Sequence, residues 1–313
     1  MITTHSLRID YENLTAVHDL DLKIYPGQIY GLVGPNGAGK TSTIKAIAGI
    51  IEPTYGEIKI GNVDLELQPQ EALKQLGYMP DFSPVYENLK VWEYLDVFAI
   101  AYKIEGSARY NRVHDWLKKV NLDSKAHTLI RELSRGMRQR LVLAKTLLPE
   151  PSVLLLDEPA SGMDPMARMD LWNTLKETAS QGTTILISSH ILTELSDFCT
   201  AIGIMEKGRM VVSGTINEIR AQIGSQGQLF VRLVDPQETA RITLRNILSA
   251  CPFLKEITEV TMGTFQANFY GNDQEAVLLL KQLVHDGLPI TDFHIREENV
   301  EDIFFKVGAR EVS

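Results

Sequence analysis

Residues 34–41, Gly34-Pro35-Asn36-Gly37-Ala38-Gly39-Lys40-Thr41, set the fold class of this chain. They match a pattern of Gly, four free positions and then Gly-Lys-Thr, which is typical of a phosphate-binding loop. The apolar run at residues 28–33 predicts a buried strand before the loop, and residues 42–50 predict a helix after it. Strand, loop and helix in this order are the expected setting of such a loop. We therefore expect an α/β fold built around a phosphate-loop nucleotide site.

The loop has the chemistry that a triphosphate requires. Its glycines let the backbone approach phosphate oxygens, and the following helix N-terminus adds a partial positive charge. Lys40 is expected to reach the β- and γ-phosphates, and the Thr41 hydroxyl to ligate Mg²⁺. We therefore predict that ATP and Mg²⁺ bind here. The residues expected to hold the nucleotide are Asn36, Gly37, Ala38, Gly39, Lys40, Thr41 and Ser42.

Composition limits the functions that this chain can have. Its 313 residues suffice for two domains, and a net charge of -9 argues against a broad nucleic-acid surface. Uncharged apolar runs long enough to cross a membrane are absent from the sequence, as is a secretory signal. Any membrane role is therefore expected to need a separate partner chain. The two cysteines, Cys199 and Cys251, are expected to be free thiols in a reducing compartment.

A second motif supplies two neighbouring acids. Residues 153–156 form an apolar run, and Asp157 and Glu158 follow it directly. An acid at the end of a central strand lies beside the phosphate loop in such sheets, so Asp157 is expected to hold Mg²⁺. Glu158 could orient and deprotonate the attacking water. Alone, the pair would be two solvated acids after a core strand, but the phosphate loop favours the catalytic interpretation.

A third motif, Leu133-Ser134-Arg135-Gly136-Met137, begins a predicted helix. Ser134 is a good N-cap, and Gly136 leaves room for a ligand at the first helical turn. Alone, the motif predicts only a helix start. Its position before Asp157 makes the chain resemble the nucleotide-binding subunit of ATP-binding cassette (ABC) transporters. Their signature is Leu-Ser-Gly-Gly-Gln, from which Arg135 and Met137 depart.

The resemblance covers about residues 1–220 and implies roles for further residues. It implies a phosphate-loop ATPase domain with a RecA-like core, an antiparallel β subdomain and a helical subdomain. Asp164, in the family's D-loop, is expected near the nucleotide, and His190 matches the switch histidine. Tyr11 lies where the family places an aromatic ring on adenine. Without the other motifs, these residues would be a turn residue, a structural histidine and an isolated tyrosine.

Asp81 is the main departure from the family. A Gln that meets Mg²⁺ or water is expected within residues 77–81, and this chain offers Asp81 instead. A carboxylate can still bind metal or accept a hydrogen bond from water. It also places negative charge beside the triphosphate.

Apolar periodicity predicts the other elements of the first domain. Residues 5–24 are expected to form short strands and residues 87–120 to be helical. The expected apolar stripe of the helical region is Trp92, Leu95, Phe98 and Ile100. The remaining predictions are strands at 56–60, 152–156 and 183–188, helices at 134–148 and 167–179, and a hairpin at 203–212.

A second domain is expected after a small, polar stretch at residues 223–227. We assign residues 1–222 to the ATPase domain and 228–313 to a C-terminal α+β domain. The predicted order of the latter is ferredoxin-like: strand 229–234, helix 236–250, strands 256–262 and 265–270, helix 274–287 and strand 290–295. A short helix at 300–307 resembles the end of exporter-type subunits. Packing and dimer support, or ligand sensing, both remain open for this domain.

The resemblance implies an ATP hydrolase subunit of an exporter. Two chains, expected to be copies of each other, would close head-to-tail so that Ser134 and Gly136 of one complete the Lys40 site of the other. Catalysis would use Lys40, Glu158 and His190. A separate transmembrane permease would dock near residues 81–95, which places the subunit peripherally at the cytoplasmic face of the membrane.

The alternative is a soluble, non-transport ABC ATPase that acts as a mechanical switch on nucleic acid or ribosomes. Such proteins carry paired cassettes, long coiled coils or basic arms. This chain has one cassette, no sustained heptads and an acidic balance, so a nucleic-acid partner is not expected. An Asn-Lys-x-Asp base reader, which a GTPase needs, is absent from the sequence.

Overall fold

The structure is a computed structural model that describes residues 1–191, 194–195, 198–215, 218–219 and 227–296. The chain divides into two units, Met1–Thr215 and Ile216–Ser313. Most of the polar stretch at 223–227, where we expected the domain boundary, lies outside the described residues. The helix predicted at 300–307 also lies outside them. Each unit is described below by itself.

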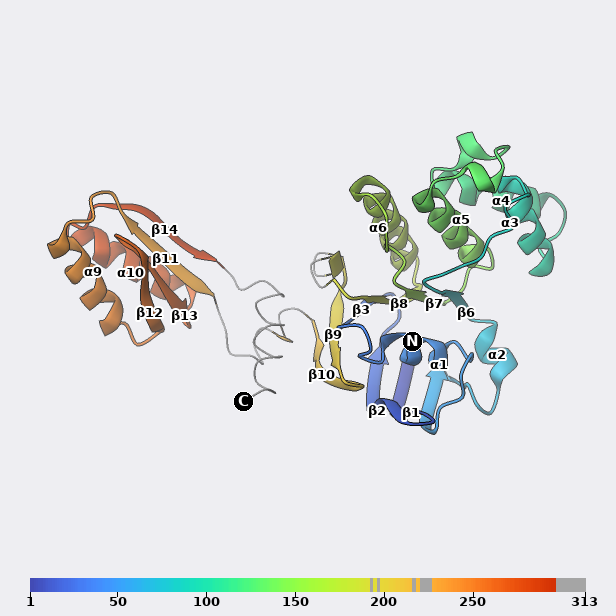
Figure 1. Ribbon diagram of the computed structural model, residues 1–313, viewed down its shortest axis with the longest axis horizontal. Coiled ribbons are helices and arrows are strands. Elements are labelled where there is room, and N and C mark those ends of the chain that lie inside the picture. Colours follow the sequence, from blue (N-terminus) through green and yellow to red (C-terminus); the bar gives the residue numbers. More distant parts are fainter. Residues whose placement is uncertain (192–193, 196–197, 216–217, 220–226, 297–313) are drawn as a thin grey trace. The chain divides into compact units, whose positions relative to one another are not determined.

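The N-terminal unit combines two sheets with helices (Figure 1). Its strands are β1 (Ile2–Tyr11), β2 (Leu14–Ile24), β3 (Ile29–Val33), β4 (Tyr55–Ile60), β5 (Val63–Asp64), β6 (Leu76–Met79), β7 (Val153–Asp157), β8 (Thr184–Ser189), β9 (Ala201–Glu206) and β10 (Arg209–Gly214). Its helices are α1 (Lys40–Ile47), α2 (Pro69–Leu73), α3 (Val91–Ala101), α4 (Gly106–Lys119), α5 (Arg135–Leu147) and α6 (Pro165–Ser180), with short 3₁₀ helices at Asp123–Lys125 and Ile130–Glu132.

The larger sheet has the strand order β10-β9-β3-β8-β7-β6. Strands β6, β7, β8, β3 and β9 run parallel, and β10 is antiparallel on the edge. The residues of β3, β7 and β8 are all buried, as expected for apolar strands covered on both faces. Because these three strands are neighbours and parallel, the residues that follow them meet at one edge of the sheet. The phosphate-loop α/β fold is confirmed.

Helix α1 is fixed by packing on both sheets of this unit. The smaller, antiparallel sheet has the order β2-β1-β4-β5. Ile44 and Ile47 of α1 belong to one buried core that also contains Leu20 of the smaller sheet and Leu186 of the larger one. The helix that follows the phosphate loop is therefore held between the two sheets. The loop thus runs between a buried strand, β3, and a firmly packed helix, α1.

Helices α3, α4 and α5 contact one another and form the helical part of this unit (Figure 1). The apolar stripe that we predicted here is partly wrong, because Trp92 is 36% exposed and Ile100 is 52% exposed. Contacts with the neighbouring helices α4 and α5 select a different face. The buried residues of α3 are Val91, Tyr94, Leu95 and Ala99.

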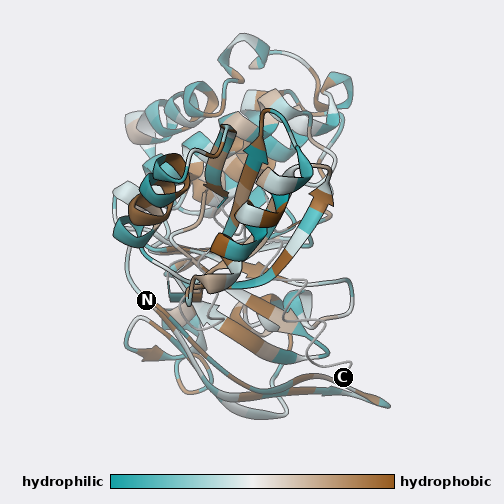
Figure 2. Ribbon diagram, turned by 90° about the vertical axis from the view of Figure 1, so that its left-hand side faces the viewer, coloured by the Kyte–Doolittle hydropathy of each residue, from teal (hydrophilic) through white to brown (hydrophobic). Residues whose placement is uncertain are grey.

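The C-terminal unit has the predicted strand–helix–strand–strand–helix–strand order. Its elements are β11 (Gln228–Leu233), α9 (Glu238–Ala250), β12 (Leu254–Thr261), β13 (Thr264–Phe269), α10 (Asp273–His285) and β14 (Ile290–Arg296). The sheet is antiparallel with the order β12-β13-β11-β14, which is the ferredoxin-like arrangement. Buried and more exposed residues alternate along β13, and hydropathy alternates along these strands in Figure 2. Val231, Phe265, Leu248 and Leu283 share one core.

Candidate active site

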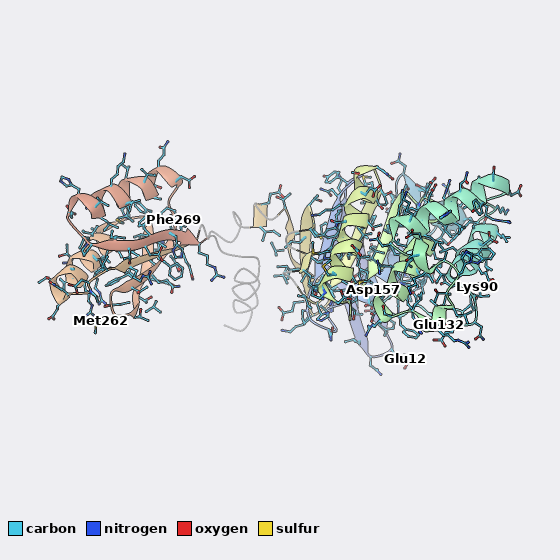
Figure 3. All side chains as sticks on the ribbon, turned by 90° about the horizontal axis from the view of Figure 1, so that it is seen from above. Glu12, Lys90, Glu132, Asp157, Met262 and Phe269 are labelled. Carbon is cyan, nitrogen blue, oxygen red and sulfur yellow. The ribbon has the colours of Figure 1, made fainter. Side chains whose placement is uncertain are left out.

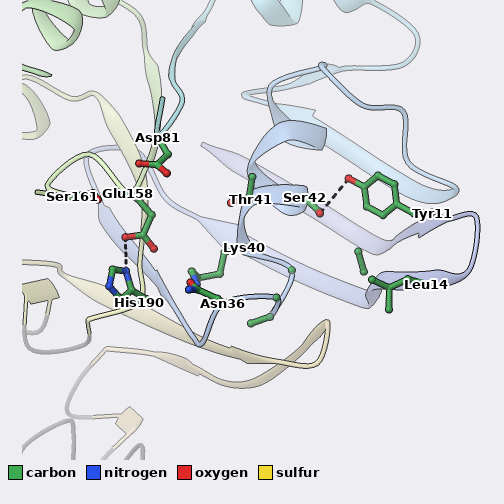
Figure 4. Close-up of a pocket in the computed structure, with 14 residues that line it drawn as sticks. Tyr11, Leu14, Asn36, Lys40, Thr41, Ser42, Asp81, Glu158, Ser161 and His190 are labelled. Carbon is green, nitrogen blue, oxygen red and sulfur yellow. Dashed lines mark hydrogen bonds and ion pairs between the residues drawn. The ribbon is translucent and has the colours of Figure 1, made fainter. Parts of the chain in front are cut away.

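A cavity of about 440 Å³ opens where the phosphate loop meets the edge of the larger sheet (Figure 4). Loop, strand-end and β-hairpin residues surround it. Its lining consists of Tyr11, Leu14, Ala16, Asn36, Gly37, Ala38, Gly39, Lys40, Thr41, Ser42, Asp81, Glu158, Ser161 and His190. The structure thus brings the predicted phosphate-loop residues together with Tyr11, Asp81, Glu158 and His190.

Lys40 begins α1, and its side chain turns back over the loop that precedes it. Its ammonium group donates hydrogen bonds to the carbonyl oxygens of Gly34 at 2.6 Å and Pro35 at 3.1 Å. Burial lowers the pKa of Lys40, and the nearby carboxylates of Glu158 and Asp157 oppose that shift. A buried ammonium group whose hydrogen bonds go to neutral carbonyls can exchange them for an anionic ligand. The new hydrogen bond is then charge-assisted and stronger.

Two glycines of the loop have left-handed backbone conformations but different surroundings. Gly39 has φ +100° and Gly37 has φ +83°. A Cβ atom on Gly39 would collide with the carbonyl oxygen of Ala16, whereas one on Gly37 would meet no atom within 4 Å. Position 39 therefore requires glycine both for its backbone angle and for its close packing on β2. Position 37 requires glycine only for its backbone angle.

We expect Gly39→Ala to destabilise the protein and to weaken nucleotide binding more than Gly37→Ala does. Both variants incur backbone strain of ~1–3 kcal/mol. Gly39→Ala adds an overpacking cost of ~1–3 kcal/mol, because the colliding atom belongs to the backbone of β2. Urea unfolding and calorimetric ATP titration of the two variants measure the difference. Equal loss of stability in both would contradict this account of the loop.

Asp157, labelled in Figure 3, ends β7 and is 2% exposed. Its Oδ1 atom accepts hydrogen bonds from the Thr41 hydroxyl at 3.2 Å and from the Ser188 hydroxyl at 2.6 Å. Ser188 also accepts a bond from the backbone N–H of Glu158 at 2.9 Å. A single hydroxyl on β8 therefore positions both acidic residues.

Sequence reasoning missed Ser188 as a member of this site. In the parallel register of β7 and β8, Ser188 is paired with Asp157. A signal was available, because Ser188 and Ser189 follow the apolar run of the strand predicted at residues 183–188. Ser161, three residues before Asp164, also lines the cavity, and we did not predict it as a site residue.

Glu158 and His190 touch each other across two strand ends. Oε2 of Glu158 lies 2.9 Å from Nδ1 of His190, and the Glu158 side chain is 16% exposed (Figure 4). Glu158 has φ +49°, which is unusual for a residue with a side chain. Strained backbone of this kind persists when the surroundings fix it, and it gathers at functional sites. With this backbone conformation, Glu158 lines the cavity.

The oxygen donors in the cavity, and that of Asp157 beside it, suit Mg²⁺. Thr41 and Asp157 present oxygen atoms 3.2 Å apart, close to the ~2.9 Å that separates adjacent ligands of an octahedral magnesium ion. The carboxylates of Asp81 and Glu158 line the same cavity. Hard oxygen donors are what this cation prefers, and substrate phosphates usually complete its shell. The residues present therefore fit the predicted metal.

Tyr11 lines the opposite part of the cavity (Figure 4). Its ring is 47% exposed, and its hydroxyl lies 3.3 Å from the Ser42 hydroxyl. A half-exposed aromatic ring next to the phosphate loop offers a flat apolar surface to a nucleotide base. The contact with Ser42 ties this ring to the start of α1.

Ser134, Gly136 and Asp164 are not among the residues that line this cavity. Ser134 caps α5 by accepting a hydrogen bond from the N–H of Met137 at 3.3 Å. Asp164 caps α6 by accepting one from the N–H of Ala167 at 3.0 Å. Gly136 is buried, and a Cβ there would lie 3.3 Å from the Cβ of Ala167. The predicted nucleotide residues therefore form two separate groups within one chain.

Comparison with known proteins identifies the family. A family model described as "ABC transporter" matches residues 17–161. The chain is 31% identical over 313 residues to "Nod factor export ATP-binding protein I" of Cupriavidus pinatubonensis, covering 100% of this chain and 92% of the relative. This chain belongs to the ABC transporter family, as an ATP-binding subunit. The family predicted from the motifs is confirmed, and the subunit is an ATP hydrolase.

Other relatives agree with this membership. The ABC subunit is 33% identical over 303 residues to the protein of the same name from Burkholderia pseudomallei, covering 96% of this chain and 95% of the relative. It is 33% identical over 228 residues to "Probable multidrug ABC transporter ATP-binding protein YbhF" of Escherichia coli, covering 73% of this chain and 39% of that protein.

Solved structures share the fold of the ABC subunit. A structure titled "Structure of ATP binding subunit of ABC transporter" has a TM-score of 0.66 at 31% identity, covering 72% of this chain and 93% of that one. A dimeric cassette in a post-hydrolysis state with ADP and Pi has a TM-score of 0.63 at 23% identity, covering 69% and 99%. Within the described residues, the subunit has no helix with the length and apolar character needed to cross a membrane.

Proposed function

We propose that two copies of this subunit bind Mg-ATP between them, head-to-tail, and that hydrolysis drives export through a separate membrane subunit. The observation that carries this proposal is the separation of the two groups of nucleotide residues. Lys40, Thr41 and Glu158 line one cavity, and Asp157 contacts Thr41 beside it. Ser134 and Gly136 begin α5 outside that lining. A second copy turned end for end would bring its α5 N-terminus to the open side of the cavity.

The residues of the cavity divide the chemistry of hydrolysis among them. The ammonium group of Lys40 exchanges its carbonyl partners for phosphate oxygens and balances their charge. Thr41 and Asp157, with Asp81 beside them, would hold Mg²⁺, which supplies further charge neutralisation when it is bound. The aromatic ring of Tyr11 would pack against the nucleotide base. The loop residues from Asn36 to Ser42 direct backbone N–H groups at the phosphates.

Glu158 is the group that takes a proton from the attacking water. Its carboxylate already accepts a contact from His190, which holds it in one orientation. A positioned base of this kind contributes about 10²–10⁴-fold to a rate. His190 is 47% exposed, so its ring is open to the nucleotide side of the cavity as well.

ATP stabilises the closed pair because the triphosphate contacts both half-sites there and only one in the separated subunits. Hydrolysis removes the γ-phosphate from between them and favours reopening. We infer that this movement is transmitted to a membrane subunit docked near residues 81–95, at the cytoplasmic face. The names of the Cupriavidus and Burkholderia relatives include export, which supports that direction of transport. The membrane subunit selects the cargo.

Mixing two inactive variants tests the head-to-tail site. Ser134→Asp keeps a good helix cap but places a negative charge opposite the γ-phosphate, and Lys40→Ala removes the phosphate ligand. We expect each variant alone to hydrolyse ATP poorly. A mixture regains activity, because a mixed pair contains one site built from the intact Lys40 and the intact Ser134.

Ser134→Asn is the matched control, since it caps the helix without adding charge. It is expected to retain most of the turnover, which a coupled phosphate-release assay measures. Normal turnover in Ser134→Asp, or a mixture as inactive as its components, would refute the head-to-tail arrangement.

A further inference from the structure

Helix α6 contacts the segment that follows His190 through two side chains on the same helical face. Trp172 stacks on Phe198 with ring centroids 4.5 Å apart. One turn nearer the N-terminus of α6, Nη1 of Arg168 lies 2.7 Å from Oε1 of Glu194. The aromatic pair packs the two elements together, and the ion pair joins them nearer the start of α6.

Arg168 joins two segments that come from different strand ends. Besides its ion pair with Glu194, its Nη2 atom donates to the carbonyl oxygen of Met163 at 3.4 Å. Met163 belongs to the loop that begins at Glu158, and Glu194 lies four residues after His190. The Glu194 side chain is only 11% exposed, so water screens this ion pair weakly. The guanidinium group of Arg168 therefore connects the loop that begins at Glu158 to the segment that follows His190.

A second, smaller cavity of about 170 Å³ is lined by Arg168, Trp172 and Glu194 together with Glu158 and His190. The ion pair and the contact between Glu158 and His190 therefore border the same small cavity. Nε of Arg168 is buried and has no hydrogen-bond partner among the described residues. An unpartnered buried donor lowers stability, so packing alone does not account for an arginine here.

We propose that Arg168 is a positioning residue for hydrolysis. By binding Glu194 and the Met163 carbonyl at once, it fixes the segment that carries His190 to the loop that carries Glu158. This keeps His190 within hydrogen-bond distance of Glu158, at 2.9 Å. The inference rests on the proposed function, in which Glu158 and His190 carry out hydrolysis. A planar fork can bridge the two partners, whereas a lysine ammonium can hold only a point contact.

A double-mutant cycle separates this role from a purely structural one. Glu194→Gln removes the charge with little change in shape, and we expect kcat for ATP hydrolysis to fall about 10-fold while KM changes less than about twofold. In a His190→Ala background, Glu194→Gln should lower kcat no further, because the group that it positions is gone. Arg168→Lys, which keeps the charge and loses the fork, should reproduce both results if Glu194→Gln folds poorly.

Asp170→Asn is the matched control. Asp170 lies on the same helix and pairs with Arg140 at 3.2 Å, away from the cavity. Its loss is expected to leave kcat unchanged while lowering the melting temperature about as much as Glu194→Gln does. An unchanged kcat in both Glu194→Gln and Arg168→Lys, or an equal fall with and without His190, would overturn the proposal. Failure of Glu158→Gln or His190→Ala to slow hydrolysis would instead overturn the proposed function.

Discussion

Replacement of Glu158 with glutamine is expected to slow ATP hydrolysis by about 10²–10⁴-fold and to leave ATP affinity almost unchanged. The amide has nearly the same shape as the carboxylate and can keep the contact with His190, which lies 2.9 Å away in the native protein. It cannot accept a proton from water. The loss therefore falls on kcat, which single-turnover phosphate release measures, while calorimetric titration measures ATP binding.

Glu150→Gln is a matched control for this result. Glu150 is also a glutamate with positive φ, at +52°, and it pairs with Arg112 at 3.2 Å outside the cavity. Its replacement is expected to change neither binding nor turnover. Normal turnover in Glu158→Gln would show that another group takes the proton.

Replacement of Lys40 with alanine is expected to weaken ATP binding by about 10²–10³-fold, because the proposed charge-assisted hydrogen bonds from its ammonium group to phosphate would be lost. The effect on stability should be small or favourable. In the protein without nucleotide, burial lowers the pKa of Lys40 and so disfavours its charge, even though nearby carboxylates oppose this shift. Calorimetric titration with ATP measures the first expectation, and urea unfolding without nucleotide measures the second.

Lys45→Ala provides the comparison, since Lys45 is in the last turn of the same helix and outside the cavity lining. It is expected to bind ATP normally. Equal ATP affinity in Lys40→Ala and the native protein would contradict the assignment of this cavity to the triphosphate.

Local motifs made much of the cavity predictable. The phosphate loop and the pair Asp157-Glu158 each place their residues relative to a single strand, so their spacing in the sequence already fixes their geometry. Their meeting also followed, because parallel neighbouring strands end at the same edge. The helix cap at Ser134 was predictable for the same local reason, and it is confirmed by the hydrogen bond from Met137.

Features that depend on register between strands, or on which helix face packs, were not predictable in the same way. The role of Ser188 depends on the register between β7 and β8, because its partner Asp157 lies 31 residues earlier in the chain. The stripe through Trp92 and Ile100 failed because apolar residues occur around much of α3, and tertiary contacts alone selected the buried face. The roles of Ser134, Gly136 and Asp164 depend on a second subunit, so they stay predictions.

The Ser188 hydroxyl has a consequence for how this enzyme can diverge. It donates to the carboxylate of Asp157 and accepts from the backbone of Glu158, so the residue assigned to the metal and the residue assigned to the water share one support. We therefore expect a change on β8 that tilts this hydroxyl to alter cation affinity and proton transfer together. Natural variation at this position would therefore have little freedom to change metal affinity and the rate of hydrolysis separately.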